Sequence, residues 1–469
     1  MRFPFLIFLL IVVFLNTLAI AQNKQFLYGF QEIPQVLLEN PGSEVNFVKH
    51  IGIPFLSGIH ITAGTSNGLI SNLFANDGVD IEDKLQRILF RLDSKDFISI
   101  NEQLEIINIG FKLKNDKDYL SVGFYQEFDL ISYYPKELAI LFYQGNTDGN
   151  GNIDLNKSHD IKGARFKSEV IGVFHAGISR KITEKLNLGI RAKIYSGGFN
   201  IQSLNNKGSI STRLDQNNNY QHLLNNVDAT FRSSGFTKTS NNSFIAAAAK
   251  NIFFGGNLGL GFDAGFTYHL KENITLLGSV LDIGFISYSK DVTTYKINGD
   301  IEINNIGLLD PPVDETLDYW DVRSEAINSQ IPKDTIHSTY VSFKSPKVNM
   351  ALQYKFGNHF RQTACSTSSY SSKRGYQNEI GIQLYTIFRP KQPQVATTLY
   401  YSRSLTDFLK TKITYTADSH SFSNVGIGFS AQIGKFNMYA SAENIFGYGN
   451  IYNSKKLGVL FGMNLIFGE

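Results

Sequence analysis

The feature that most constrains the fold is a strict alternation of apolar and polar side chains, which recurs along most of the chain. In the segment 186–195, Leu188 and Ile190 alternate with Asn187, Gly189 and Arg191. A period of two predicts β-strands that show an apolar surface to one side and a polar surface to the other. We therefore predict an all-β protein. Other segments with the same period are 118–129, 349–356 and 424–433.

Two architectures fit so many alternating strands: a soluble sandwich or barrel, and a transmembrane barrel. Segments of about ten residues are long enough to cross a bilayer when tilted. Their polar faces are rich in small Gly, Ser, Asn and Gln, which suits a wet or filled lumen. A sheet that faces lipid must close, because hydrocarbon offers no partner to an edge strand. We predict a closed antiparallel transmembrane β-barrel of roughly 14 strands over residues 45–469.

The carboxyl end favours the membrane barrel. Apolar residues alternate from Leu457 to Phe467, almost to the last residue. This segment resembles the C-terminal strand signal by which outer-membrane barrels are recognised for assembly. It departs from that signal because Phe467 is third from the end rather than last.

Two segments depart from the period of two. Residues 80–93 place Ile81, Leu85 and Ile88 at helical spacing, with Asp80 available as an N-cap. The stretch "YYPKELAILFYQG" has Pro135 near the first turn of a second helix. We predict short helical insertions at both places. Along the strands, 186–203 and 207–215 are predicted as two separate elements.

The first residues have the pattern of a secretory signal peptide. Arg2 precedes an apolar run from Phe3 to Leu15, and Ala19-Ile20-Ala21 provides a cleavage site. The run is short for a membrane-spanning helix, which needs about 20 residues. We predict cleavage of residues 1–21, export, and a location in the cell outer membrane.

Composition agrees with an exported barrel and excludes several classes of protein. Charged residues make up 18% of the chain, below the usual share of about 25%. The net charge of +3 gives no nucleic-acid footprint. A single cysteine, Cys365, rules out an internal disulfide framework. Tyrosines near strand ends are expected to anchor the barrel at the membrane interfaces: Tyr133, Tyr134, Tyr400 and Tyr401.

One loop partly matches a calcium-binding loop. Asn146, Asp148, Asn150 and Asp154 occupy positions 1, 3, 5 and 9 of that pattern. Position 12, which requires a bidentate Glu, is Lys157. The turn chemistry of Asn, Gly and Asp explains the same residues without a metal. The sequence therefore gives only a weak calcium-like loop, and we predict no metal and no cofactor.

No pattern of Ser, His and acidic residues selects a catalytic site. His159 lies beside Asp160, and His337 and His420 lie beside serines. Neighbours on a strand point to opposite faces, so such pairs do not form a nucleophile and its base. We expect these histidines to be solvated loop or rim residues, and we predict that the protein is not an enzyme.

The N-terminal box carries a family resemblance. Gln31-Glu32-Ile33-Pro34 is followed by Asn40-Pro41-Gly42, and the chain then runs into "VNFVKHIGIPFLSGIH". This box resembles an uncharacterised family of Bacteroidota outer-membrane barrels, across nearly the whole mature chain. More distantly, the chain is similar to FadL and PorV barrels. FadL-like proteins carry an Asn-Pro-Ala box in a hatch inside the barrel, where Gly42 here replaces Ala.

The resemblance implies a domain order and a set of functions. Residues 22–44 would form an N-terminal hatch, with Asn40, Pro41 and Gly42 where the hatch meets the first wall strand. A FadL-like role is passage of a hydrophobic or small solute past that hatch, with membrane lipid around the wall. A PorV-like role is binding of secreted proteins or the type IX secretion machinery, for example through residues 307–340. An outer-membrane enzyme with a Ser/His pair at the rim is a weaker alternative.

Overall fold

The computed structural model describes most of the chain. Within these described parts, no helix is both long and apolar enough to cross a membrane. The predicted signal peptide, residues 1–21, lies outside them. The described residues are 25–66, 78–134, 136–144, 154–155, 157–214, 216, 220–235, 250–304, 329–361, 374–418, 424–448 and 454–468.

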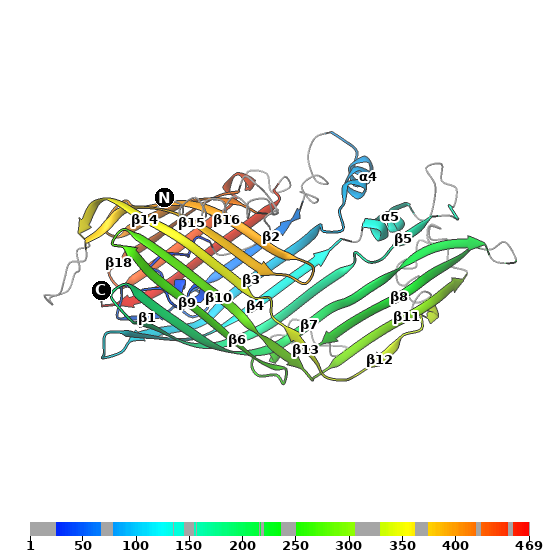
Figure 1. Cartoon of the computed structure of the whole chain (residues 1–469), viewed down its shortest axis with the longest axis horizontal. Helices are drawn as coiled ribbons and strands as arrows, with labels where there is room; N and C mark the ends of the chain where they lie inside the picture. The colour runs from blue at the N-terminus through cyan, green and yellow to red at the C-terminus, as the bar shows by residue number, and fades with distance from the viewer. Residues whose placement is uncertain are drawn as a thin grey trace, which may run out of the picture.

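A single antiparallel sheet closes on itself (Figure 1). The short strands β1 (Lys49–Gly52) and β2 (Ile59–Thr65) together form its first member, because both pair with β3 (Phe97–Lys112) and with β20 (Lys456–Phe467). The ring therefore has no free edge, and it contains 14 strands as predicted. The others, in ring order after β3, are β4 (Asp118–Tyr133), β6 (Arg165–Lys181), β7 (Leu186–Leu214), β9 (Leu258–Lys271), β10 (Ile274–Tyr288), β14 (Lys347–Arg361), β15 (Arg374–Phe388), β16 (Pro393–Ser404), β17 (Leu409–Ala417), β18 (Asn424–Ile433) and β19 (Phe436–Glu443).

The wall extends beyond the ring on one side. β7 is one strand of 29 residues, so the predicted division of 186–215 into two strands was wrong. The reason is that its register with β8 shifts near Leu204 and Lys207 while pairing continues on both sides of the shift. Residues 186–196 of β7 pair with β9 in the barrel. Residues 200–214 pair with β8 and continue into the sheet that projects on the right of Figure 1. That sheet adds β5 (Ser158–Asp160), β8 (Tyr220–Ser234), β11 (Val292–Asn304) and β12 (Asp334–Ile336), while β13 (Tyr340–Phe343) pairs with the end of β10.

The two ends of the barrel differ in the length of their connections. At the end where β1 begins and β20 finishes, most connections are short, as at residues 113–117, 182–185 and 272–273, and the longer connection 362–373 joins β14 to β15. The opposite end carries the projecting sheet and the two predicted helices, α4 (Ile81–Arg91) and α5 (Lys136–Gln144). Short turns at one end and long connections at the other are typical of outer-membrane barrels.

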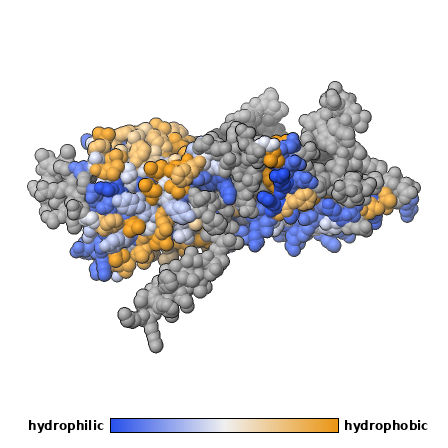
Figure 2. Space-filling model, turned by 90° about the horizontal axis from the view of Figure 1, so that it is seen from above, coloured by the Kyte–Doolittle hydropathy of each residue, from blue (hydrophilic) through white to orange (hydrophobic). Residues whose placement is uncertain are grey.

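The outer wall is a continuous band of exposed apolar side chains. Figure 2 shows apolar residues gathered over the barrel, while the projecting sheet is mostly hydrophilic. The alternate residues of the same strands point inward and are polar and buried, as Asn187, Arg191 and Lys193 are on β7. This arrangement defines a membrane-spanning barrel rather than a soluble one. Exposed members of the band include Ile190, Ile194, Leu260, Met350, Leu352, Ile382, Leu399, Ile413, Ile427 and Val459.

The prediction of interfacial tyrosines was wrong for Tyr133 and Tyr400, which are buried. Tyr401 is 37% exposed, whereas Tyr133 and Tyr400 are 2% and 3% exposed. Neighbouring residues on a strand face opposite sides, so only one tyrosine of each adjacent pair can contact lipid. Tyr400 points inward, where its ring lies 3.9 Å from the Lys412 ammonium.

We predict that the outer band responds to charge as a lipid-facing surface does. Ile382, in the middle of β15, is 42% exposed and contacts hydrocarbon in this arrangement. Replacing it by Arg is expected to reduce the free energy of unfolding in a bilayer by about 2–4 kcal/mol. The matched control is Leu405→Arg, which changes an exposed residue in the turn after β16. Reversible urea unfolding in lipid vesicles measures both, and equal losses would contradict the assignment of the band.

Candidate functional site

Residues 25–43, here the N-terminal segment, are mostly buried and contact inward-facing side chains of the barrel. Their partners belong to strands on all sides of the ring, from β3 and β20 to β7, β10 and β17. The described backbone–backbone hydrogen bonds of the segment join it only to itself, as in Phe30 to Leu27 and Asn40 to Val36. The barrel holds this segment through side chains and not through strand pairing.

Lys412 on β17 binds the first turn of the segment. Its ammonium donates to the carbonyl oxygens of Tyr28 at 2.8 Å and Phe26 at 3.1 Å. The same ammonium lies 5.2 Å from the ring centroid of Phe30 and 3.9 Å from that of Tyr400. Lys412 is 1% exposed, so its charge is stabilised by carbonyl dipoles and aromatic faces rather than by water.

Arg191 on β7 binds the other end of the segment. It donates to the carbonyl oxygens of Leu37 at 2.8 Å and Leu38 at 2.7 Å, and its Nε donates to Asp263 at 2.6 Å. Leu37 and Leu38 belong to α2 (Val36–Glu39), a single turn whose last carbonyls have no partner within the helix. A cation beside these carbonyls satisfies them and opposes the negative end of the turn. The Ser279 hydroxyl on β10 donates a hydrogen bond to the carbonyl oxygen of Glu39, at 2.7 Å.

Apolar contacts fill the space between these polar anchors. Phe26, Phe30 and Ile33 pack with Tyr439 and Leu460 of the wall. Further along, Val36 and Leu37 pack with Phe47, Tyr119 and Ile466. Gln35 joins two strands at once, because its amide bonds both Glu105 and Asn464 at 2.8–3.0 Å. The segment is thus a small core enclosed by a polar-lined wall.

The Asn40-Pro41-Gly42 turn lies flat against two glycines of the wall. Gly189 on β7 and Gly265 on β9 are directly paired across the sheet. A Cβ at Gly265 would overlap the Asn40 side-chain oxygen, and one at Gly189 would overlap the Pro41 carbonyl. Asn40 accepts the amide of Gly42 at 2.9 Å and donates to the carbonyl of Phe266 at 3.0 Å. The box predicted from sequence is therefore a turn that docks into a glycine-lined patch of the wall.

After the turn, a second set of side-chain contacts holds the backbone of Gly42 and Ser43. Asn187 on β7 donates to the carbonyl of Gly42 at 3.0 Å. Ser179 on β6 donates to the carbonyl of Ser43 at 3.1 Å, and Asn187 in turn donates to Ser179 at 2.7 Å. From there the chain passes to β1. Wall side chains thus bind the backbone as far as Ser43, and the chain enters the sheet at Lys49, the first residue of β1.

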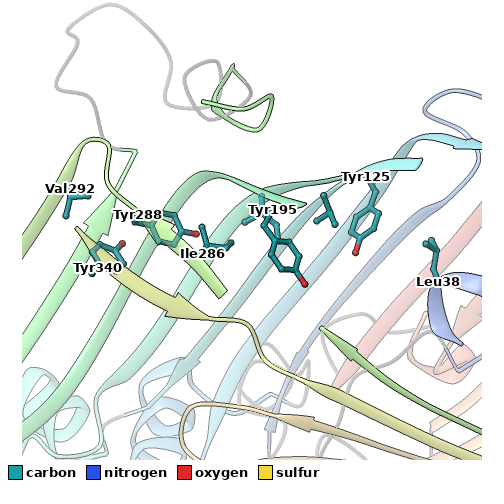
Figure 3. Packing of buried hydrophobic residues seen from close by; sticks show 9 residues of the cluster. Leu38, Tyr125, Tyr195, Ile286, Tyr288, Val292 and Tyr340 are labelled. Carbon is teal, nitrogen blue, oxygen red and sulfur yellow. The ribbon is translucent and has the colours of Figure 1, made fainter. Parts of the chain in front are cut away.

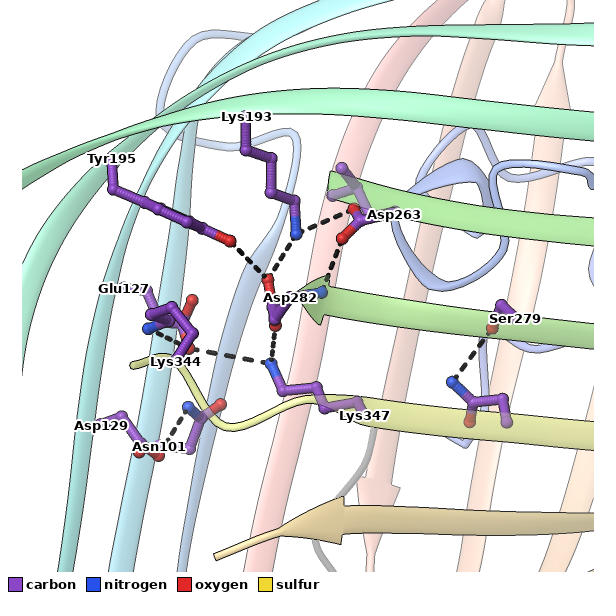
Figure 4. A network of polar contacts seen from close by, with 12 residues as sticks. Asn101, Glu127, Asp129, Lys193, Tyr195, Asp263, Ser279, Asp282, Lys344 and Lys347 are labelled. Atoms are coloured by element: carbon purple, nitrogen blue, oxygen red, sulfur yellow. Dashed lines mark hydrogen bonds and ion pairs between the residues drawn. The ribbon is translucent and has the colours of Figure 1, made fainter. Parts of the chain in front are cut away.

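Next to the segment, ionised side chains cross the lumen (Figure 4). Asp282 is at their centre, in a bulge of β10 where its φ is +60°, a conformation that non-glycine residues rarely adopt. It accepts Lys193 at 2.5 Å and Lys347 at 2.8 Å, and its own amide donates to Asp263 at 2.7 Å. We call the whole set the charged layer: Glu127, Asp129, Glu169, Lys193, Asp263, Asp282, Lys344, Lys347 and Arg389.

Two contacts of the charged layer join separate parts of the wall. Arg389, just after β15, binds Asp129 on β4 through both guanidinium nitrogens, with Nη2 and Oδ1 3.0 Å apart. Lys344, between β13 and β14, lies 2.6 Å from Glu169 on β6. β15 and β4 stand on nearly opposite sides of the ring, so the Arg389–Asp129 pair spans the lumen. The Lys344–Glu169 pair joins parts of the wall that are four strands apart. All four side chains are less than 10% exposed.

A cavity of about 40 Å³ remains between the charged layer and the N-terminal segment. It has room for water, which needs roughly 10–15 Å³ by the same measure. Leu38 and Glu39 line it from the segment, and Lys193, Lys347 and Arg389 line it from the wall. Leu38 and Tyr125 also belong to a row of packed side chains that crosses several strands and includes Tyr195, Tyr288 and Tyr340 (Figure 3).

The other predicted sites have mixed outcomes. Asn146, Asp148 and Asn150 lie outside the described residues, so the calcium-like loop stays untested, with only Asp154 in view. His159 was expected to be solvated, but it is fully buried in β5 and lies 3.2 Å from Glu137 of α5. The correction follows from the pairing of β5 with β7, which covers the histidine.

Sequence reasoning missed the residues that hold the lumen together. Arg191 was recognised only as part of a polar strand face, and Lys412, Asp282 and Arg389 were not singled out. A signal existed for Asp282, because it is a lone acid within the apolar run "LLGSVLDIGFISY". An ionised group in such a run needs a partner of opposite charge. Nothing in the sequence says which of the other strands supplies it.

The fold defines a class: a closed transmembrane β-barrel of 14 strands with an apolar outer wall and buried ion pairs among its inward-facing side chains. The chain belongs to the family of unknown function DUF5723, which matches residues 41–443. The expectation of an uncharacterised barrel family is thereby confirmed. No curated protein matches the chain.

Solved structures similar to the chain are also barrels. The toluene transporter TodX of P. putida is 10% identical over 97% of this chain and 96% of its own, with a TM-score of 0.40. The toluene transporter TbuX of Ralstonia pickettii is 8% identical over 92% and 94%, with a TM-score of 0.41. A Pseudomonas aeruginosa FadL homologue is 9% identical over 93% and 94%, also with a TM-score of 0.41.

We predict that a methyl group in the glycine patch displaces the Asn40-Pro41-Gly42 turn. Gly265→Ala should reduce stability by about 1–3 kcal/mol, the usual cost of overpacking. Amide exchange in residues 38–43 should rise with it, as measured by mass spectrometry. The control is Gly177→Ala on β6, where a Cβ would have its nearest neighbours at 3.2 Å. Adding Asn40→Gly to Gly265→Ala should restore part of the loss, and no restoration would argue against direct overlap.

We also predict that Lys412 holds the first turn of the segment in place. Lys412→Met keeps the apolar stem but removes the donors to Phe26 and Tyr28. Hydrogen bonds from charged groups contribute about 1.5–3 kcal/mol, so amide protection of residues 26–30 should fall by roughly tenfold or more. The control is Lys435→Met, which changes an exposed lysine in the turn before β19. Unchanged protection in Lys412→Met would show that the aromatic contacts suffice.

Proposed function

We propose that the protein is an outer-membrane channel for a small solute, in which residues 22–44 act as a hatch. One observation carries this proposal: the described part of that stretch occupies the lumen, yet it shares no strand pairing with the wall. Such a segment can move without opening the sheet, because its ties to the wall are side-chain contacts. The barrel itself stays closed in lipid whichever position the segment takes.

The ties are of a strength that permits movement. A neutral hydrogen bond contributes a net 0.5–1.5 kcal/mol or so, and one from a charged donor about 1.5–3 kcal/mol. Lys412 and Arg191 bind carbonyl oxygens of the backbone, so they can bind water or a solute oxygen in their place. By contrast, moving a wall strand would expose a row of unpaired backbone groups to lipid.

The proposed solute is a hydrophobic or small molecule. TodX of P. putida and TbuX of Ralstonia pickettii, two of the similar proteins, are toluene transporters. For this chain the proposal rests on its own lumen. No feature of the described residues favours the alternatives, in which the outer loops bind secreted proteins or a rim Ser/His pair catalyses a reaction.

The hatch is tested by its removal and by its fixation. A variant that lacks residues 25–40 should admit small solutes into lipid vesicles at least tenfold faster than the intact chain. A second variant avoids a truncated lumen: Gln35→Cys with Asn464→Cys, in a Cys365→Ser background, bridged by a short thiol-reactive linker. Gln35 and Asn464 contact each other at 2.9–3.0 Å, so a linker between them holds the segment against β20.

The two variants should move permeability in opposite directions. The bridged protein should lose the solute flux of the unbridged double-cysteine protein, and cleavage of the linker should restore it. Cys365→Ser alone, treated with the same reagent, is the control. If neither deletion nor bridging alters the flux, residues 22–44 are not a hatch.

A further inference from the structure

The charged layer has acids on one wall of the lumen and bases on the opposite wall. Glu127 and Asp129 project from β4, and Glu169 projects from β6. Across the lumen, Lys344 and Lys347 lie at the start of β14, and Arg389 follows β15. Lys167 is the exception on the acidic wall, and it donates to the carbonyl of Phe343 at 2.8 Å. Between these walls, Lys193 pairs with both Asp263 and Asp282. Arg191 is the second partner of Asp263, and Lys347 is the second partner of Asp282.

Opposite charges on facing walls create an electric field across the lumen. The separation of charge acts on any solute at this level, and it is strong because the groups are removed from bulk water. In the structure these opposite charges bind each other directly, Arg389 with Asp129 and Lys344 with Glu169. Any solute that passes has to separate these pairs.

The cost of that separation depends on the chemistry of the solute. Removing one partner from a buried ion pair costs about 3–5 kcal/mol, because the other charge is left unpaired. An apolar molecule offers nothing to either charge. A solute with an anionic group and a cationic group can pair with both walls at once, so that no charge is left alone.

We propose that the charged layer is a selectivity site for small zwitterionic solutes. The solute's carboxylate would bind Lys344, Lys347 and Arg389, and its ammonium would bind Glu127, Asp129 and Glu169. The 40 Å³ cavity directly beside the layer, lined by Glu39, Lys193 and Asp282, is the next polar position on the way to the N-terminal segment. This inference rests on the proposed channel function and names the class of solute.

The proposal is tested by osmotic swelling of vesicles that contain the intact protein. Glycine is the zwitterionic probe, and a neutral amide or polyol of similar size is the reference. Wild type should admit glycine at least threefold faster than the reference. Asp129→Asn with Arg389→Gln removes one pair that crosses the lumen, and it should bring the ratio of the two rates close to one. Asp129→Arg with Arg389→Asp restores the pair in reverse, and it should restore the ratio.

A matched control and a second preparation keep the outcomes distinct. Asp118→Asn with Arg180→Gln removes an ion pair of the same two residue types, 2.5 Å long, at the opposite end of β4 and β6. Its ratio should equal that of wild type. If no solute enters even when residues 25–40 are deleted, the channel function fails. If solutes enter but the ratio is the same in all variants, or an apolar solute is preferred, the channel stands and the zwitterion site is overturned.

Discussion

Closure of one antiparallel sheet is the constraint on which the rest of the structure depends. In hydrocarbon an unpaired amide or carbonyl has no partner, so the first member of the sheet must bond the last. Here β1 and β2 do this together by pairing with β20 and β3. Closure then separates the side chains into two populations, because alternate residues face lipid or lumen. The apolar coat and the polar interior follow from the same alternation.

A closed wall also encloses polar side chains, which need hydrogen-bond partners inside the barrel. This chain fills it with its own N-terminal segment, and the wall grips mainly the backbone of that segment. Arg191 and Lys412 stand on opposite sides of the ring, and each binds consecutive or nearby carbonyl oxygens. A buried cation is costly unless its donors are satisfied, and free carbonyls are costly for the same reason. Each therefore supplies what the other lacks. Gly189 and Gly265 add shape complementarity. Because they have no side chain, the Asn40-Pro41-Gly42 turn can lie directly against the backbone of the wall.

How much the sequence could predict depended on whether a property is local. The face of each strand followed from the period of two, as Ile190 and Arg191 illustrate on β7. The length of β7 did not, because a register shift at Leu204 leaves no mark in the pattern. Tyr400 was misplaced for a simpler reason: adjacent tyrosines cannot both face lipid, and residue type alone does not say which one does. His159 was misplaced because its cover comes from a distant strand.

The sequence by itself determined the class of this protein: a transmembrane barrel with an apolar outside, a polar inside and a distinct box at residues 40–42. These properties are set by neighbours along the chain, at a spacing of two residues. Only the tertiary structure decided that Asn40 rests on Gly265, and that Arg389 meets Asp129 across the lumen. Such pairs lie hundreds of residues apart, and they are fixed by the number of strands and their register when the sheet closes. The candidate site is made of these pairs, so it came into view only with the closed ring.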